Sequence, residues 1–169
     1  MKACLLTALL LGPALCASDW PRFRGPGGDG SWNPPGLPKD LSQLDPQPAW
    51  KQTVGGGFGG VTVADGRAYV MDRLKEPEER ERVLCFDAAD GSPLWQHAYP
   101  VRYESLDHGN GPRASVTIHQ GRALAFGAMG MLGCLDAKSG RLLWQRDLVK
   151  ENGAVVPTWG FAASPFIWK

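Results

Sequence analysis

Apolar and polar residues alternate along most of this chain in short runs, a pattern that favours β-strands over helices. The clearest run is VLCFDAADGSPLWQ, residues 83–96, in which Leu84 and Phe86 alternate with Cys85 and Asp87. The segment DAADG within it supplies turn chemistry, with a glycine where the backbone needs a positive φ. The run therefore predicts a strand, a tight turn and a second strand that carries a tryptophan.

This unit recurs at residues 132–145, LGCLDAKSGRLLWQ, 49 positions later. The two copies share a cysteine, an aspartate, a glycine and a tryptophan at the same offset. The matched pairs are Cys85 with Cys134, Asp87 with Asp136, Gly91 with Gly140, and Trp95 with Trp144. A fixed period of this size indicates stacked copies of one supersecondary unit.

Each copy also contains an earlier hairpin pattern. In the first copy, residues 61–64 and 67–72 flank the turn Asp65-Gly66. The second copy predicts strands at 114–118, 122–126, 131–136 and 141–148. Residues 74–82, rich in Glu and Arg, are predicted to form a solvated loop whose deletion leaves folding largely intact. A metal site there is disfavoured because the arginines already neutralise the carboxylates of Glu76, Glu78, Glu79 and Glu81.

Incomplete copies flank the two complete ones. Residues 48–54 match the outer strand of the repeat, and Trp50 takes the place of Trp95. Residues 163–167 align with 114–118, so a third copy begins near residue 161. We therefore expect the chain to be a carboxy-truncated portion of a longer protein, with blade faces and strand edges left open to aggregation.

Composition suits one soluble globular unit: 43% of residues are hydrophobic, 21% are charged, and the formal net charge is +1. This balance argues against nucleic-acid and membrane-surface binding. Residues 1–18 combine a lysine, an apolar run and small residues, which predicts a secretory signal too short for a stable transmembrane anchor. We thus expect export to a periplasmic or extracellular location. Lipidation of Cys16 is disfavoured because Leu15 precedes it.

Residues 19–47 are rich in Pro and Gly and are predicted to run as an extended arm whose aromatic residues dock on a sheet. Arg22 and Arg24 could contact anions, but packing beside aromatic rings is favoured. The glycine-rich run 55–60 is followed by a strand, not a helix, which disfavours a phosphate-binding loop. Cys85 and Cys134 are expected to be buried free thiols, while Cys4 and Cys16 leave with the signal or lie at its edge.

The motif C-[FL]-D-A-x-x-G-x-x-L-W-Q, at 85–96 and 134–145, resembles the pyrroloquinoline-quinone-like (PQQ-like) β-propeller repeat. The resemblance covers residues 48–169, and the segments WPRFRGPGGDG, HGNGPRAS and PTWGFAASP resemble an exported, non-catalytic bacterial branch. It implies an all-β partial propeller of four-stranded antiparallel blades. We expect an outer strand at 48–54, blades at 59–99 and 112–148, and the start of a third at 161–169. Seven residues form the structural signature of the repeat: Trp50, Asp87, Gly91, Trp95, Asp136, Gly140 and Trp144.

Strand parity in such blades places the variable connections on one rim and minimal turns on the other, and binding residues usually concentrate in variable loops. The candidates for contact with a ligand or partner are Tyr103, Glu104, Asp107, His108, Asn110, Arg113 and Trp159. Against this, Asp107 and Asn110 can satisfy turn amides, Arg113 can pair with a neighbouring loop, and Trp159 can cap a blade interface. We favour these structural roles. His108 has no nucleophile or second histidine at a useful spacing, so no catalytic, cofactor or metal residue is assigned.

Two classes of function remain. The first is a non-catalytic, exported scaffold that binds a protein, peptide or glycan through one face, without a cofactor. The second is a fragment of a quinoprotein dehydrogenase that uses PQQ with Ca²⁺. The resemblance implies adjacent cysteines and a calcium-binding acid set in catalytic members, and the chain has no Cys-Cys pair. An outer-membrane-assembly propeller is a further alternative.

Overall fold

The structure is a computed structural model that describes residues 19–32, 40, 42, 47–104 and 106–168. The predicted secretory signal, Cys4 and Cys16 lie outside the described residues. Within them, eight strands form two four-stranded antiparallel sheets, each with its strands in chain order. The first sheet contains β1 (Thr62–Ala64), β2 (Arg67–Leu74), β3 (Arg80–Asp87) and β4 (Pro93–Pro100). The second contains β5 (Thr117–His119), β6 (Arg122–Phe126), β7 (Met131–Asp136) and β8 (Leu142–Asp147).

The two sheets are copies of one blade, which confirms the predicted all-β class. The strands of each sheet are joined as a meander, and the register of β3 with β4 shifts between Cys85 and Phe86. The register of β7 with β8 shifts at the equivalent place, between Cys134 and Leu135. A bulge repeated at the same motif position shows that the sequence repeat is also a repeat of backbone geometry.

The predicted solvated loop at 74–82 is wrong at both ends. β2 continues to Leu74 and β3 begins at Arg80, so the connection between the strands is residues 75–79. Residues 80–86 alternate between the two faces of the sheet, and this alternation carries Glu81 into the interior, where it is fully buried. Deleting residues 74–82 would therefore remove part of a central strand.

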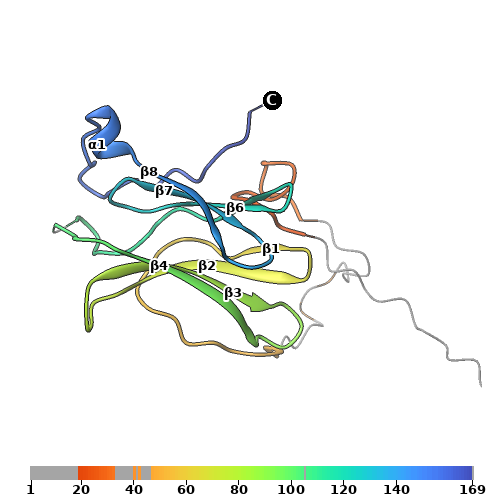
Figure 1. Cartoon of the computed structure of the whole chain (residues 1–169). Helices are drawn as coiled ribbons and strands as arrows, with labels where there is room; N and C mark the ends of the chain where they lie inside the picture. The colour runs from red at the N-terminus through yellow and green to blue at the C-terminus, as the bar shows by residue number, and fades with distance from the viewer. Residues whose placement is uncertain (1–18, 33–39, 41, 43–46, 105, 169) are drawn as a thin grey trace, which may run out of the picture.

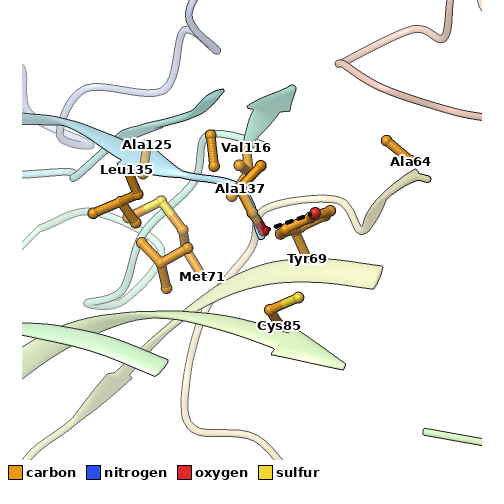
Figure 2. Packing of buried hydrophobic residues seen from close by; sticks show 10 residues of the cluster. Ala64, Tyr69, Met71, Cys85, Val116, Ala125, Leu135 and Ala137 are labelled. Carbon is orange, nitrogen blue, oxygen red and sulfur yellow. Dashed lines mark hydrogen bonds between the residues drawn. The ribbon is translucent and has the colours of Figure 1, made fainter. Parts of the chain in front are cut away.

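The sheets are stacked face to face, and the core lies between them (Figure 1). Tyr69, Met71 and Cys85 point up from the first sheet, while Ala125 and Leu135 point down from the second (Figure 2). The Tyr69 hydroxyl donates a hydrogen bond to the carbonyl oxygen of Ala137 at 3.2 Å, which ties the sheets together at one end. Cys85 and Cys134 are buried and free, as predicted.

Trp50 contacts the first sheet as its place in the repeat predicts, although residues 48–54 pair with no described strand. The segment runs along the face of the first sheet that is turned away from the second (Figure 1). The indole Nε1 of Trp50 donates to the Ala88 carbonyl oxygen at 3.0 Å. Trp95 makes the same contact with Ala137, one sheet later, at 3.1 Å.

The amino-terminal arm joins the inner strands of both sheets. Trp20 exchanges two backbone hydrogen bonds with Val63, and the carbonyl oxygen of Pro21 accepts a hydrogen bond from the Ile118 amide at 2.8 Å. Arg22 lies over the Phe166 ring, 5.6 Å from its centroid, and donates to the carbonyl oxygens of Gly25 and Pro26. In the described part of the arm, Arg22 is therefore used in packing.

Candidate binding site

The variable connections of the two sheets lie together on one side of the stack, here called the loop rim (residues 55–60, 75–79, 101–113 and 148–160). Backbone hydrogen bonds join them: Phe58 donates to Pro112 at 2.8 Å, and Asp107 donates to Thr158 at 3.0 Å. The opposite side of each sheet has a two-residue turn, Asp65-Gly66 or Gln120-Gly121, beside the motif turn. The loop rim is thus where the two sheets differ most.

Tyr103 is held between two glutamates. Its amide donates to the Glu79 carboxylate at 2.9 Å, and its hydroxyl donates to Glu81. Arg73 pairs with Glu79 and lies over the Tyr103 ring, 4.7 Å from the centroid. Burial alone would raise the pKa of Glu79, but the Tyr103 amide and Arg73 outweigh it and lower that pKa.

Glu81 is the centre of a buried polar cluster between the sheets. It accepts hydrogen bonds from the hydroxyls of Tyr99 and Tyr103 and from the Ala128 amide, the last at 3.1 Å. Gly127 lies so close that a Cβ there would overlap the Glu81 carboxylate and the Tyr99 hydroxyl. Burial, followed by the charge of Glu81, raises the pKa values of both tyrosines. The sequence analysis did not predict this cluster. The signal was that Glu81 lies two and four positions before Val83 and Cys85, on the same buried face of the strand.

Asp72 forms a second set of buried contacts, beside Gly55 at the beginning of the glycine-rich run. Arg82 binds its carboxylate with two hydrogen bonds, of 2.6 and 2.9 Å, and the Gly55 amide donates to it at 2.5 Å. The hydrogen bond to Asp72 raises the pKa of Arg82. These contacts fix where the loop rim leaves the first sheet.

The predicted candidates between 107 and 113 hold their own loop together. The Asn110 side chain accepts a hydrogen bond from the Leu106 amide at 3.0 Å. Arg113 donates to the carbonyl oxygens of Gly111 and Gly109 at 2.6 Å each and to that of Asp107 at 3.0 Å. It also lies over the Phe58 ring, 4.8 Å from the centroid. These contacts stabilise the loop, and the sequence analysis gave such structural roles as the alternative to ligand binding.

The other candidates remain accessible. Asp107 and His108 are exposed, with the His108 backbone at a φ of 63°, and the Trp159 side chain is 56% exposed. Glu104 is also exposed and lines a groove on the loop rim with a volume of about 640 Å³. The groove lies between the connection that joins the two sheets and the segment that follows the second sheet. Its lining residues are Arg102, Glu104, Leu106, Met129, Asp147, Val149, Lys150, Val155, Val156, Pro157 and Thr158.

The sequence identified the loop rim but not this groove. The groove forms because residues 101–104 and 148–158 follow the outer strands of neighbouring sheets on the same side. A short helix, α1 (Leu148–Asn152), folds the second segment back. Asp147 caps α1 by accepting a hydrogen bond from the Lys150 amide at 3.1 Å. This hydrogen bond lowers the pKa of Asp147. The helix cap at Asp147 could be recognised in the sequence. The contact between the two segments could not, because it depends on how the sheets stack.

The described residues contain no group of three or more His, Cys, Asp or Glu side chains arranged to hold a metal ion. In the same part of the chain, no helix is long and apolar enough to cross a membrane.

Residues 40–156 match the family model described as outer membrane protein assembly factor BamB. The crystal structure of BamB from Moraxella catarrhalis is 20% identical, with a TM-score of 0.43; the match covers 60% of this chain and 28% of that one. Quinohemoprotein alcohol dehydrogenase ADHIIG from Pseudomonas putida HK5 is 20% identical, with a TM-score of 0.48 and coverage of 71% and 17%. The corresponding enzyme from Comamonas testosteroni is 17% identical, with a TM-score of 0.45 and coverage of 79% and 20%. No curated protein matches the chain.

Proposed function

The chain belongs to the PQQ-like β-propeller repeat family of the outer membrane protein assembly factor BamB, and from this premise we propose that it is a non-catalytic binding module that presents its loop rim to a partner. The proposed partner is a protein, peptide or glycan. The proposed location is outside the cytoplasm, on the evidence of the signal-like residues 1–18.

One observation carries the proposal: the connections of the loop rim are pinned to one another, yet they leave apolar side chains open. Phe58 and Trp159 are more than half exposed, and Val155 is 85% exposed. Apolar side chains left exposed on a surface among polar neighbours can serve as contacts for a partner. Binding loops held on a rigid sheet scaffold are the usual arrangement in propellers and sandwiches.

Photo-crosslinking in the producing cells tests the proposal. A photoreactive phenylalanine analogue is placed at Trp159 on the loop rim and, as the matched control, at Lys138, which is exposed in a turn on the opposite side. We expect discrete crosslinked species from position 159 and none from position 138. Equal yields from both positions, or none from either with the protein folded and exported, would contradict the proposal.

The dehydrogenase alternative has its own measurement. Titration of the full chain with PQQ and Ca²⁺ would give a bound-quinone absorbance and Ca²⁺-dependent alcohol oxidation if the alternative held. The scaffold proposal expects neither signal.

A further inference from the structure

We propose that the groove between one wall of Arg102, Glu104 and Leu106 and another of residues 155–158 binds an extended peptide segment of a partner protein. The segment carries an apolar side chain for the groove floor, an acidic residue opposite Arg102 and a basic residue opposite Glu104. This inference rests on the proposed function, because it names the site and the occupant on the same loop rim.

On one wall of the groove, just after β4 ends at Pro100, alternate residues of the chain donate hydrogen bonds to Glu79. The amides of Val101 and Tyr103 both donate to Glu79, to its carbonyl oxygen at 3.1 Å and to its carboxylate at 2.9 Å. In an extended segment, alternate residues point their backbone groups in opposite directions. Arg102 and Glu104 therefore turn theirs away from Glu79. An extended peptide laid beside such a wall can pair with it in the manner of an added strand.

The charges on this wall have the spacing of an extended peptide. Among the described residues, the side chains of Arg102 and Glu104 have no hydrogen-bond or ion-pair partner, and both line the groove. Two positions along an extended chain span about 7 Å, the distance between side chains i and i+2 of a bound strand. An acid and a base two residues apart would thus meet Arg102 and Glu104 together.

The rest of the groove favours a peptide over other ligands. Lys150 and Asp147 pair with each other at 3.0 Å on the opposite wall, so the lining has no net charge to attract a polyanion. Leu106, Met129 and Val149 offer an apolar lining. Aromatic rings, a common platform for sugar rings, do not line the groove. Its volume of about 640 Å³ lies within the usual range for ligand sites.

The experiment selects peptides from a displayed library of random twelve-residue sequences against the full chain and measures their affinities by fluorescence anisotropy. We expect selected peptides to carry an acidic and a basic residue two positions apart beside an apolar residue. Arg102→Glu and Glu104→Arg should each weaken binding at least about threefold, because each places like charges together. Lys138→Glu, an exposed charge reversal on the opposite side, should leave binding unchanged.

A charge-swap variant makes the test specific. The double variant Arg102→Glu with Glu104→Arg should prefer peptides in which the acid and the base are exchanged, a result that damage to the fold cannot produce. Peptides that bind all variants equally, or a library that yields no binder to the folded chain, would overturn this inference. Crosslinking from position 159 would still support the proposed function in either case, so the two failures are distinguishable.

Discussion

Gly91 and Gly140 each lie under the indole ring of a tryptophan from the preceding repeat. Both have a positive φ, 76° and 72°, and a Cβ on either would lie 2.6 Å from the ring of Trp50 or Trp95. The motif therefore combines two requirements at one position: a left-handed turn and a flat surface for the neighbouring ring. This physical reason for the W…G spacing is visible only when two repeats are stacked.

Gly91→Ala should lower the free energy of unfolding by about 2–4 kcal/mol, the sum of left-handed strain and overpacking against Trp50. Gly66→Ala is the matched control, because Gly66 has a similar φ of 69° but no atom within 4 Å of the added Cβ. The control should cost only about 1–2 kcal/mol. Urea unfolding of the two variants measures the difference, and equal losses would show that the ring contact contributes nothing.

The three tyrosines of the chain should ionise only when it unfolds. Burial raises the pKa values of Tyr69, Tyr99 and Tyr103 above their usual value of about 10. Above that pH the unfolded chain loses protons that the folded chain keeps. The stabilisation is therefore fully present below about pH 10 and falls as pH rises, by about 1.4 kcal/mol per pH unit for each tyrosine.

Tyrosinate absorbance and circular dichroism followed together from neutral to alkaline pH check this prediction. We expect the absorbance to rise with loss of the fold, in one step. Tyr99→Phe should make stability fall less steeply with pH. A smooth titration near pH 10 in a chain that stays folded would contradict the prediction.

At the scale of the strands, neighbouring repeats are joined by a threonine at each inner strand. The Thr62 hydroxyl donates to the Val116 carbonyl oxygen at 2.6 Å, and the Thr117 hydroxyl donates to that of Pro165 at 2.7 Å. Residues 114–118 and 163–167 were predicted to be equivalent, and these bonds give them equivalent places. The segment at 163–167 thus lies against the second sheet as the second lies against the first.

Thr62→Val keeps the shape of the side chain and removes this bond. We expect a loss of about 1–3 kcal/mol, because the buried Val116 carbonyl oxygen would be left without its partner. Thr62→Ser, which keeps the hydroxyl, should lose less. Thermal unfolding of both variants measures the effect, and a larger loss for the serine variant would assign the stabilisation to the methyl group instead.

The strands could be predicted from local patterns, because period-two alternation and turn glycines depend on only a few neighbouring residues. The two sheets and the buried thiols followed from the repeat. The connection at 74–82 was predicted wrongly because its many charges outweighed the alternation that continues through Arg80, Glu81 and Arg82. Strand alternation indicated that Glu81 is buried, but not that the Tyr103 hydroxyl and the Ala128 amide, 22 and 47 residues away, would bind it. The groove could not be predicted, because its two walls come from connections that meet only when the sheets stack.

At the scale of the molecule, the equivalent tryptophans of the two sheets, Trp95 and Trp144, are covered to different extents. Trp95 packs on Gly140 and against Tyr69, with ring centroids 5.9 Å apart. Its equivalent, Trp144, is 41% exposed and lines a hollow of about 430 Å³ with Leu132, Arg146 and Leu148. The same side chain that fills an interface in the first sheet therefore presents an open apolar surface in the second.

An open apolar surface of this kind should make the purified chain associate as its concentration rises. Trp144→Arg should shift sedimentation velocity profiles towards the monomer, because a charge placed in the hollow opposes its burial. Trp159→Arg changes a tryptophan of similar exposure, 56%, on the loop rim and should leave self-association unchanged. If the two variants behave alike, the association does not run through the uncovered blade face. If only Trp144→Arg is monomeric, that face can be closed while the loop rim stays intact for the binding experiments.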